Sequence, residues 1–220
     1  MPVTRVLHGA GNDRALLTFA VHPAVDAIEA DVWSFGGTIL AHHDRRLGPL
    51  PLTVGRGGIA RIRARIGGTV SLDAILEATR GHADVVLDLR QAVPFGGDPS
   101  ADLVRALPED DRARVRVTCE DWALADRVRA WAPEIAVAYS IRSELQLRGY
   151  LAGRDAGHLD ATPVAIRHTL LHTPDEVEAL RDRAGRVGAW TVDDIDRALT
   201  LVAWGVDEIT SNRITVLNAL

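Results

Sequence analysis

The sequence predicts a (β/α)₈ barrel formed by a single domain over residues 1–220. Short apolar segments alternate with amphipathic segments about eight times along the chain. Strands that alternate with helices form parallel sheets joined by right-handed crossovers, and eight such units close into a barrel. No linker or low-complexity tract divides the chain into two parts. An open, doubly wound sheet is the alternative architecture.

The predicted elements follow from two kinds of periodicity. Eight short runs of mainly apolar residues are typical of buried strands. These runs are Val3–Leu7, Ala27–Trp33, Ala83–Leu89, Arg114–Cys119, Ile135–Tyr139, Pro163–His168, Val187–Thr191 and Val206–Thr210. Apolar residues three and four positions apart predict helices after most of these strands. The predicted helices are Ser71–Thr79, Asp121–Trp131, Ile141–Leu151, Thr173–Ala184 and Asp193–Trp204.

Two of the predicted helices begin at recognisable N-terminal signals. Ser71 is a favourable N-cap residue. Thr173 is followed by Pro174 and, three residues after the threonine, by Glu176. This order predicts a capping box with proline at the first helical position. Residues 48–68 are instead rich in Gly and Arg, and we expect them to be an excursion from the barrel without a sizeable insertion domain.

The composition excludes several classes of protein. The chain carries 30 acidic and 25 basic side chains, with 47% apolar residues, which is typical of a globular domain. A mildly acidic chain without a basic cluster argues against nucleic acid as a partner. All 25 basic residues are arginine, so mechanisms that need a lysine are excluded. The single cysteine, Cys119, lies in an apolar strand and is predicted to be a buried thiol.

The sequence gives no sign of membrane insertion or export. The N-terminus lacks a basic segment followed by a long apolar run, as a signal peptide would have. The uncharged stretch Ala15–Val25 is only about half the length of a transmembrane helix. We therefore expect a cytoplasmic protein without a transmembrane segment, and no feature indicates its oligomeric state.

Acidic residues gather near the ends of two predicted strands. Side chains alternate between the faces of a strand, so Glu29, Asp31 and Trp33 share one face. Asp88 and Arg90 share a face of the third strand, which neighbours the second in a barrel. Asp88 can then complete a site of three carboxylates. Such a site needs a compensating cation, and oxygen ligands suit Mg²⁺ or Ca²⁺.

Ion pairing is the alternative interpretation of the same residues. The carboxylates at the strand ends would then be held by arginine partners, with Arg90 bound to Asp88. In the metal-site interpretation, Arg90 is instead suited to grip phosphate oxygens in a bidentate fashion.

Two histidines lie near the same predicted strand ends. His8 follows the first strand, and His43 follows the segment 38–42. Beside a metal site, they suggest a general acid and a general base for cleavage of a P–O bond. His42 would point to the opposite face, so His43 is preferred. The alternative is that both histidines are structural. Other polar residues near strand ends have no assigned role; they are Glu120, Asp160, His168 and His172.

Several short motifs occur in a fixed order along the chain. They are His8-Gly9, Ile28-Glu29-Ala30-Asp31-Val32, Gly36-Gly37 through His43-Asp44-Arg45-Arg46-Leu47, Asp88-Leu89-Arg90, Trp190-Thr191-Val192, and Gly205-Val206-Asp207-Glu208-Ile209-Thr210-Ser211-Asn212. This ordered set resembles the glycerophosphodiester phosphodiesterase family, which typically has H-R-G, I-E-x-D-V, D-G-x-x-V-x-x-H-D-x-x-L, E-x-K, W-T-V and G-V-D-G-I-x-T-D.

The resemblance implies a fold, an activity and a set of site residues. It implies a (β/α)₈ barrel whose site lies at the C-terminal ends of the strands. The substrate would be a glycerophosphodiester or a related (lyso)phospholipid, which places the protein in lipid metabolism. The roles that it implies are a Mg²⁺ or Ca²⁺ site at Glu29, Asp31 and Asp88, acid–base catalysis by His8 and His43, and a substrate cleft lined by Trp190.

The chain also departs from the family pattern. Gly9 stands where the family has arginine, Asp88 where it more often has glutamate, and Arg90 where it has lysine. The family's E-N-T segment is reduced to Asn12-Asp13-Arg14. Some of these features resemble the sphingomyelinase D branch of the superfamily. A sphingomyelinase D or phospholipase D-like activity and a non-catalytic barrel with a degenerate site are therefore the alternatives.

Overall fold

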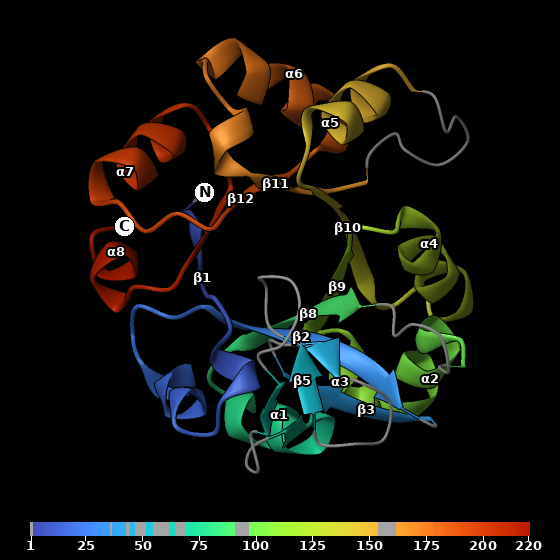
Figure 1. Cartoon of the computed structure of the whole chain (residues 1–220). Helices are drawn as coiled ribbons and strands as arrows, with labels where there is room; N and C mark the ends of the chain where they lie inside the picture. Colours follow the sequence, from blue (N-terminus) through green and yellow to red (C-terminus); the bar gives the residue numbers. More distant parts are fainter. Residues whose placement is uncertain are drawn as a thin grey trace.

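Eight parallel strands close into a barrel in the computed structural model (Figure 1). The structure describes residues 2–35, 37–42, 45–46, 52–54, 62–64, 69–90, 97–153 and 162–220. The barrel strands are β1 (Thr4–Leu7), β2 (Ala27–Phe35), β8 (Asp84–Arg90), β9 (Val115–Cys119), β10 (Ala136–Ile141), β11 (Val164–Arg167), β12 (Val187–Trp190) and β13 (Glu208–Ser211). Because β1 pairs with both β2 and β13, the sheet has no free edge at this seam. The predicted (β/α)₈ barrel and its eight strands are confirmed.

The five predicted helices are present on the outside of the barrel. They are α1 (Leu72–Thr79), α4 (Trp122–Trp131), α5 (Glu144–Leu151), α6 (Pro174–Ala184) and α7 (Ile195–Ala203). The capping box of α6 is confirmed, since Thr173 and Glu176 each accept a hydrogen bond from the other's backbone N–H. In the described ranges, no helix combines the length and apolar character needed to cross a lipid bilayer.

Other helical elements were not predicted. They are α2 (Pro99–Ala106), α3 (Glu109–Arg112), α8 (Ile214–Asn218) and the 3₁₀ helices η1 (Ala10–Asn12), η2 (Leu16–Val21) and η3 (His168–Leu170). Helix α2 has a clear start signal, because the side chain of Asp98 accepts a hydrogen bond from Ser100 N–H and Pro99 opens the helix. The connection from β1 to β2 is formed by η1 and η2, where a regular barrel has an α-helix.

The segment between β2 and α1 contains additional strands. β3 (Thr38–Ala41) pairs antiparallel with the end of β2, and β7 (Val70–Ser71) pairs with β3. A separate antiparallel sheet is formed by β4 (Arg45–Arg46), β5 (Leu52–Val54) and β6 (Ile62–Ala64). The region expected to be a Gly/Arg-rich excursion therefore includes short strands, and its other residues lie outside the described ranges.

The interior of the barrel is filled below the strand ends by small apolar residues and an ion pair. Val6, Ala27 and Val86 form a buried cluster separate from the main core. Arg116 Nη2 lies 2.6 Å from Glu208 Oε2, and Glu208 is 5% exposed. These side chains fill the part of the interior that lies away from the C-terminal ends of the strands, so the open space lies at those C-terminal ends.

The first turn after β1 packs directly on β2. A Cβ atom built on Gly11 would lie 2.5 Å from Ala30 Cβ, so only glycine fits there. Gly9 has a φ of +66°, a left-handed conformation that favours glycine. This close approach brings η1 within hydrogen-bond distance of the acidic side chains on β2.

Gly11→Ala should therefore destabilise the protein. The added methyl group forces η1 away from β2, and overpacking of this kind costs about 1–3 kcal/mol. Urea denaturation measures the change in the free energy of unfolding. Gly149→Ala in α5 is the matched control: its Cβ meets no atom within 4 Å. There alanine should stabilise the helix by about 0.5–1 kcal/mol. Equal effects at both positions would contradict the close packing of η1 on β2.

Candidate active site

A cleft of about 360 Å³ opens at the C-terminal ends of the barrel strands. Each of the eight strands contributes at least one lining residue, either from the strand itself or directly after its end. The polar and aromatic lining residues include His8, Glu29, Asp31, Asp88, Arg90, Glu120, Arg142, Arg167, His168 and Trp190. Active sites of (β/α)₈ barrels lie at this end, because the strand ends and their loops converge there. This cleft is therefore the candidate active site.

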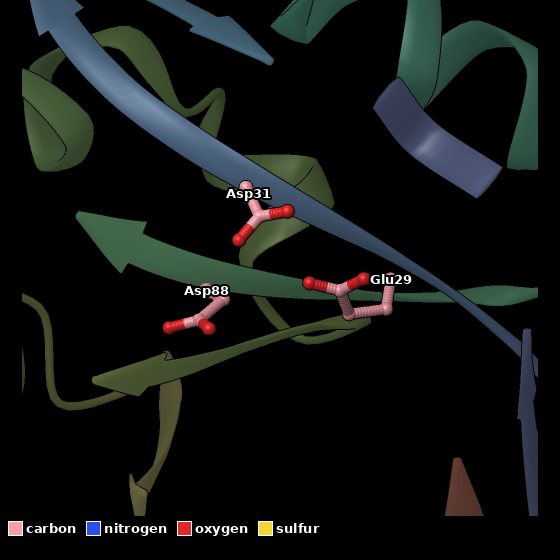
Figure 2. A group of neighbouring side chains, drawn as sticks. All are labelled: Glu29, Asp31 and Asp88. Carbon is pink, nitrogen blue, oxygen red and sulfur yellow. The ribbon is translucent and has the colours of Figure 1, made fainter. Parts of the chain in front are cut away.

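The three predicted carboxylates meet on one wall of the cleft. Figure 2 shows Glu29 and Asp31 on β2 turned toward Asp88 on β8. The register pairs Asp31 with Asp88, and one carboxylate oxygen from each of the three residues lies within 4.8 Å of the others. Glu29 and Asp31 are 6% and 5% exposed. The expectation that these side chains come together is confirmed in the geometry.

Burial makes this concentration of negative charge unfavourable. Desolvation, together with the charge of Asp31, raises the pKa of Glu29 to about 8. Desolvation also raises the pKa of Asp88 well above its usual range. Both shifts have the same meaning, which is that the ionised cluster lacks sufficient positive charge around it.

Arg90 compensates part of that charge. Its Nη2 lies 2.8 Å from Asp31 Oδ1 and 2.6 Å from Asp88 Oδ2, and its Nη1 lies 3.1 Å from Glu120 Oε1. The alternative of an ion pair at the strand end is thus present in the structure. Glu120, left without a role by the sequence, is held by Arg90 and by Arg142.

The carboxylate cluster fits a divalent cation. Within the described residues, Asp88 Oδ1 is buried and has no hydrogen-bond partner. This oxygen is therefore available to coordinate a cation. The other two carboxylates are oriented by neighbours: Gly9 N–H donates to Glu29 Oε2 at 2.6 Å, and Asn12 Nδ2 donates to Asp31 Oδ2 at 2.9 Å. Buried oxygen ligands that are fixed by further hydrogen bonds suit a hard cation such as Mg²⁺ or Ca²⁺.

His8 lies beside the cluster in a defined orientation. Its Nδ1 is 2.8 Å from Asn212 Oδ1, and its Nε2 is 3.9 Å from Glu29 Oε2. Asn212 Nδ2 donates to Asp193 Oδ2 at 2.7 Å, which leaves Asn212 Oδ1 to accept from His8. His8 must then carry its proton on Nδ1 and direct the lone pair of Nε2 into the cleft.

Asp193 is well suited to fix this arrangement as an ionised acceptor. Burial opposes ionisation, but hydrogen bonds from Asn212 and Ser211 hold the pKa of Asp193 below its ordinary value. Neither Asp193 nor Asn212 was predicted as a site residue. The motif signal was present, because Asn212 stands where the resembled family has its final aspartate.

The remaining predicted residues have different outcomes. His43 lies outside the described residues, so its role stays a prediction. The neighbouring His42 is buried and stacks on Trp33, with ring centroids 5.4 Å apart. Trp33 was expected on the same face as Glu29 and Asp31, but it packs against His42 and is not among the residues that line the cleft.

Trp190 and Cys119 lie where the sequence placed them. Trp190 lines the cleft, and its Nε1 donates to Ala165 O at 2.9 Å. This hydrogen bond fixes the orientation of the indole ring along one side of the cleft. Cys119 is buried, and desolvation raises the pKa of its thiol to about 12. A thiol that stays protonated at neutral pH is a poor nucleophile.

The similarity of this chain to known proteins is found in solved structures that share its fold. No protein-family model matches the sequence, and no curated protein matches it significantly. A phosphodiesterase from Oleispira antarctica, solved in complex with the product sn-glycerol-3-phosphate, is 20% identical, with a TM-score of 0.72 over 98% of this chain and 96% of that one. The chain has the fold of this phosphodiesterase.

Two glycerophosphodiester phosphodiesterases extend the likeness. The enzyme from Agrobacterium tumefaciens str. C58 is 22% identical, covers 100% of both chains and has a TM-score of 0.68. The enzyme from Thermotoga maritima is 15% identical, with a TM-score of 0.71 over 96% of this chain and 95% of that one. The resemblance seen in the motifs therefore extends to the whole barrel.

The Asn212–Asp193 pair should select one tautomer of His8. We expect neutral His8 to carry hydrogen on Nδ1, because Asn212 presents an acceptor to that nitrogen. The ¹⁵N chemical shifts of the neutral ring distinguish the tautomers. Asn212→Ala should shift the population toward the Nε2–H form, whereas His82→Ala, at an exposed position, should leave the His8 signals unchanged. A wild-type Nε2–H tautomer would contradict this orientation of Asn212.

Proposed function

We propose that this protein is a metal-dependent phosphodiesterase that cleaves a glycerophosphodiester or a related (lyso)phospholipid. The observation that carries the proposal is the meeting of Glu29, Asp31 and Asp88 beside His8, in the C-terminal cleft of a barrel. The barrel has the fold of solved glycerophosphodiester phosphodiesterases. The product bound to the Oleispira antarctica enzyme supports a small phosphodiester as the substrate class.

The proposed mechanism divides the work between the carboxylates and the histidines. Glu29, Asp31 and Asp88 would hold Mg²⁺ or Ca²⁺, and a bound cation supplies charge stabilisation at phosphate oxygens. His8 Nε2, with its lone pair directed into the cleft, accepts or returns a proton at the reacting oxygen. His43 is proposed as the second acid–base group. Trp190 forms a wall of the substrate cleft, and Arg90, at the edge of the carboxylate cluster, is proposed to contact the phosphate.

The metal site can be tested through a single ligand. Asp88→Asn should weaken binding of Mg²⁺ or Ca²⁺ roughly tenfold or more, because one of three charged ligands is lost. Calorimetry measures the affinity directly. Hydrolysis of bis(p-nitrophenyl) phosphate and of glycerophosphodiesters should fall and recover in part at high metal concentration. Asp182→Asn, an exposed change on α6, is the control. Unchanged metal affinity in the Asp88 variant would exclude this residue as a ligand.

The acid–base roles predict a different pattern. His8→Ala and His43→Ala should each lower kcat by about 10²–10⁴, the usual effect of removing a positioned acid or base. Metal affinity should change little, because the carboxylates hold the ion. His82→Ala, at an exposed position, is the control for loss of an imidazole. If both variants kept wild-type turnover, the two-histidine mechanism would be wrong and the non-catalytic barrel would be favoured.

The sphingomyelinase D-like alternative predicts different products. Gly9 and Asp88 favour it, since both match that branch in the sequence. Lysophosphatidylcholine or sphingomyelin would then be cleaved to choline and a lipid phosphate, whereas a glycerophosphodiesterase cleaves glycerophosphocholine to choline and glycerol 3-phosphate or a cyclic glycerophosphate. Because both reactions release choline, identification of the phosphate-containing product, with several divalent ions, separates the two activities.

A further inference from the structure

Positive side chains lie on the side of the cleft that faces the carboxylates. Arg167 ends β11, and Arg142 directly follows β10. In the closed order β1-β2-β8-β9-β10-β11-β12-β13, β11 is four strands from β2 in either direction. The two strands are therefore opposite one another across the barrel. The cleft thus has an acidic wall on β2 and β8 and a basic wall on β10 and β11.

The charges of the other lining arginines are already compensated. Arg90 contacts Asp31, Asp88 and Glu120. Arg142 contacts Glu120 at 2.9 Å and is half-exposed, with 50% of its side chain accessible. Arg167 is exposed and lines the same cleft, but within the described ranges its guanidinium has no carboxylate partner and no hydrogen-bond acceptor. It therefore retains its full capacity for a bidentate contact with an anion.

The surroundings of Arg167 strengthen its preference for an anion. The adjacent His168 also lines the cleft, and burial, with the charges of Arg197 and Arg167, lowers the pKa of its imidazole. At neutral pH His168 is then uncharged and can add a hydrogen bond. In the register of β11 and β12, Arg167 is paired with Trp190, whose indole is fixed against Ala165 O.

We infer that Arg167, assisted by Arg142, forms a subsite for a second anionic group of the substrate. The inference rests on the proposed phosphodiesterase function, in which the scissile phosphate lies at the carboxylates and His8. The alcohol part of the diester then extends along Trp190 toward β11. A carboxylate or phosphate on that alcohol reaches a guanidinium that lacks a partner. The volume of about 360 Å³ is sufficient for a small diester of this kind.

The same wall disfavours cationic head groups. A quaternary ammonium or a primary amine without an adjacent acid would bring like charge to Arg167 and Arg142. Specificity for an anionic alcohol therefore combines an attractive contact with a repulsive one. Choline esters should be poorer substrates than diesters whose alcohol carries an acid.

A pair of substrates that differ only in one charge tests the inference. sn-Glycero-3-phosphoserine and its serine methyl ester differ only in the carboxylate. We expect wild-type kcat/KM to favour the free acid about tenfold, the effect of one charge-assisted contact at a partly exposed site. Arg167→Gln should bring the ratio of the two kcat/KM values close to one. Arg148→Gln removes the same charge from the outer helix α5, where 80% of the side chain is exposed, and should keep the wild-type ratio.

The possible outcomes separate the subsite from the activity. Cleavage of both substrates with equal kcat/KM by the wild type would overturn the subsite and leave the phosphodiesterase proposal standing. An equal loss for both substrates in Arg167→Gln would assign Arg167 to the scissile phosphate instead. If the wild type cleaved no phosphodiester with any divalent ion, the proposed function would fail. Calorimetric binding of glycerophosphoserine would then decide the subsite, since Arg167→Gln must weaken it about tenfold; no binding or no change overturns it.

Discussion

The placement of three carboxylates in a space largely removed from water is the constraint on which the rest of the site depends. Like charges repel, and each loses hydration on burial, so the fold must supply compensation. Part of it comes from Arg90, and part comes from the N–H of Gly9 and the amide of Asn12. The negative charge that these groups leave uncompensated gives the site its capacity to hold a cation. The chemistry proposed for this cleft is thus a consequence of an electrostatic deficit that the barrel itself maintains.

The connection from β1 to β2 shows how the backbone brings hydrogen-bond donors to the buried carboxylates. A regular barrel has an α-helix in this connection. The short 3₁₀ turn η1 instead packs so closely on β2 that Gly11 touches Ala30, and Gly9 and Asn12 reach Glu29 and Asp31. His8 precedes this turn and takes its direction from Asn212, at the other end of the chain. The seam where the barrel closes is therefore also where the candidate acid–base group is oriented.

The sequence predicted those features of the fold and the site that follow from local residue pattern and barrel topology. Runs of apolar residues predicted all eight barrel strands, and the adjacency of the second and third of these strands predicted that Asp88 joins Glu29 and Asp31. Helix α2 was not predicted, although Asp98 and Pro99 signal its start in the sequence. The pairing of Asn212 with Asp193 joins loops after different strands, which periodicity does not reveal. The role inferred for Arg167 depends on which arginines have carboxylate partners, and only the three-dimensional contacts show that.

The ion pair below the cleft links three positions that are far apart in the sequence. Glu208 stands where the resembled family motif has glycine, and its carboxylate is held by Arg116. It fits because Gly188 has no side chain: a Cβ there would lie 3.2 Å from Glu208 Oε1. Natural variation at these sites should therefore be correlated. Homologues that keep an acid at 208 should keep glycine at 188 and a cation at 116, whereas those with glycine at 208 are free to enlarge residue 188. This covariation would mark the lineage to which the chain belongs.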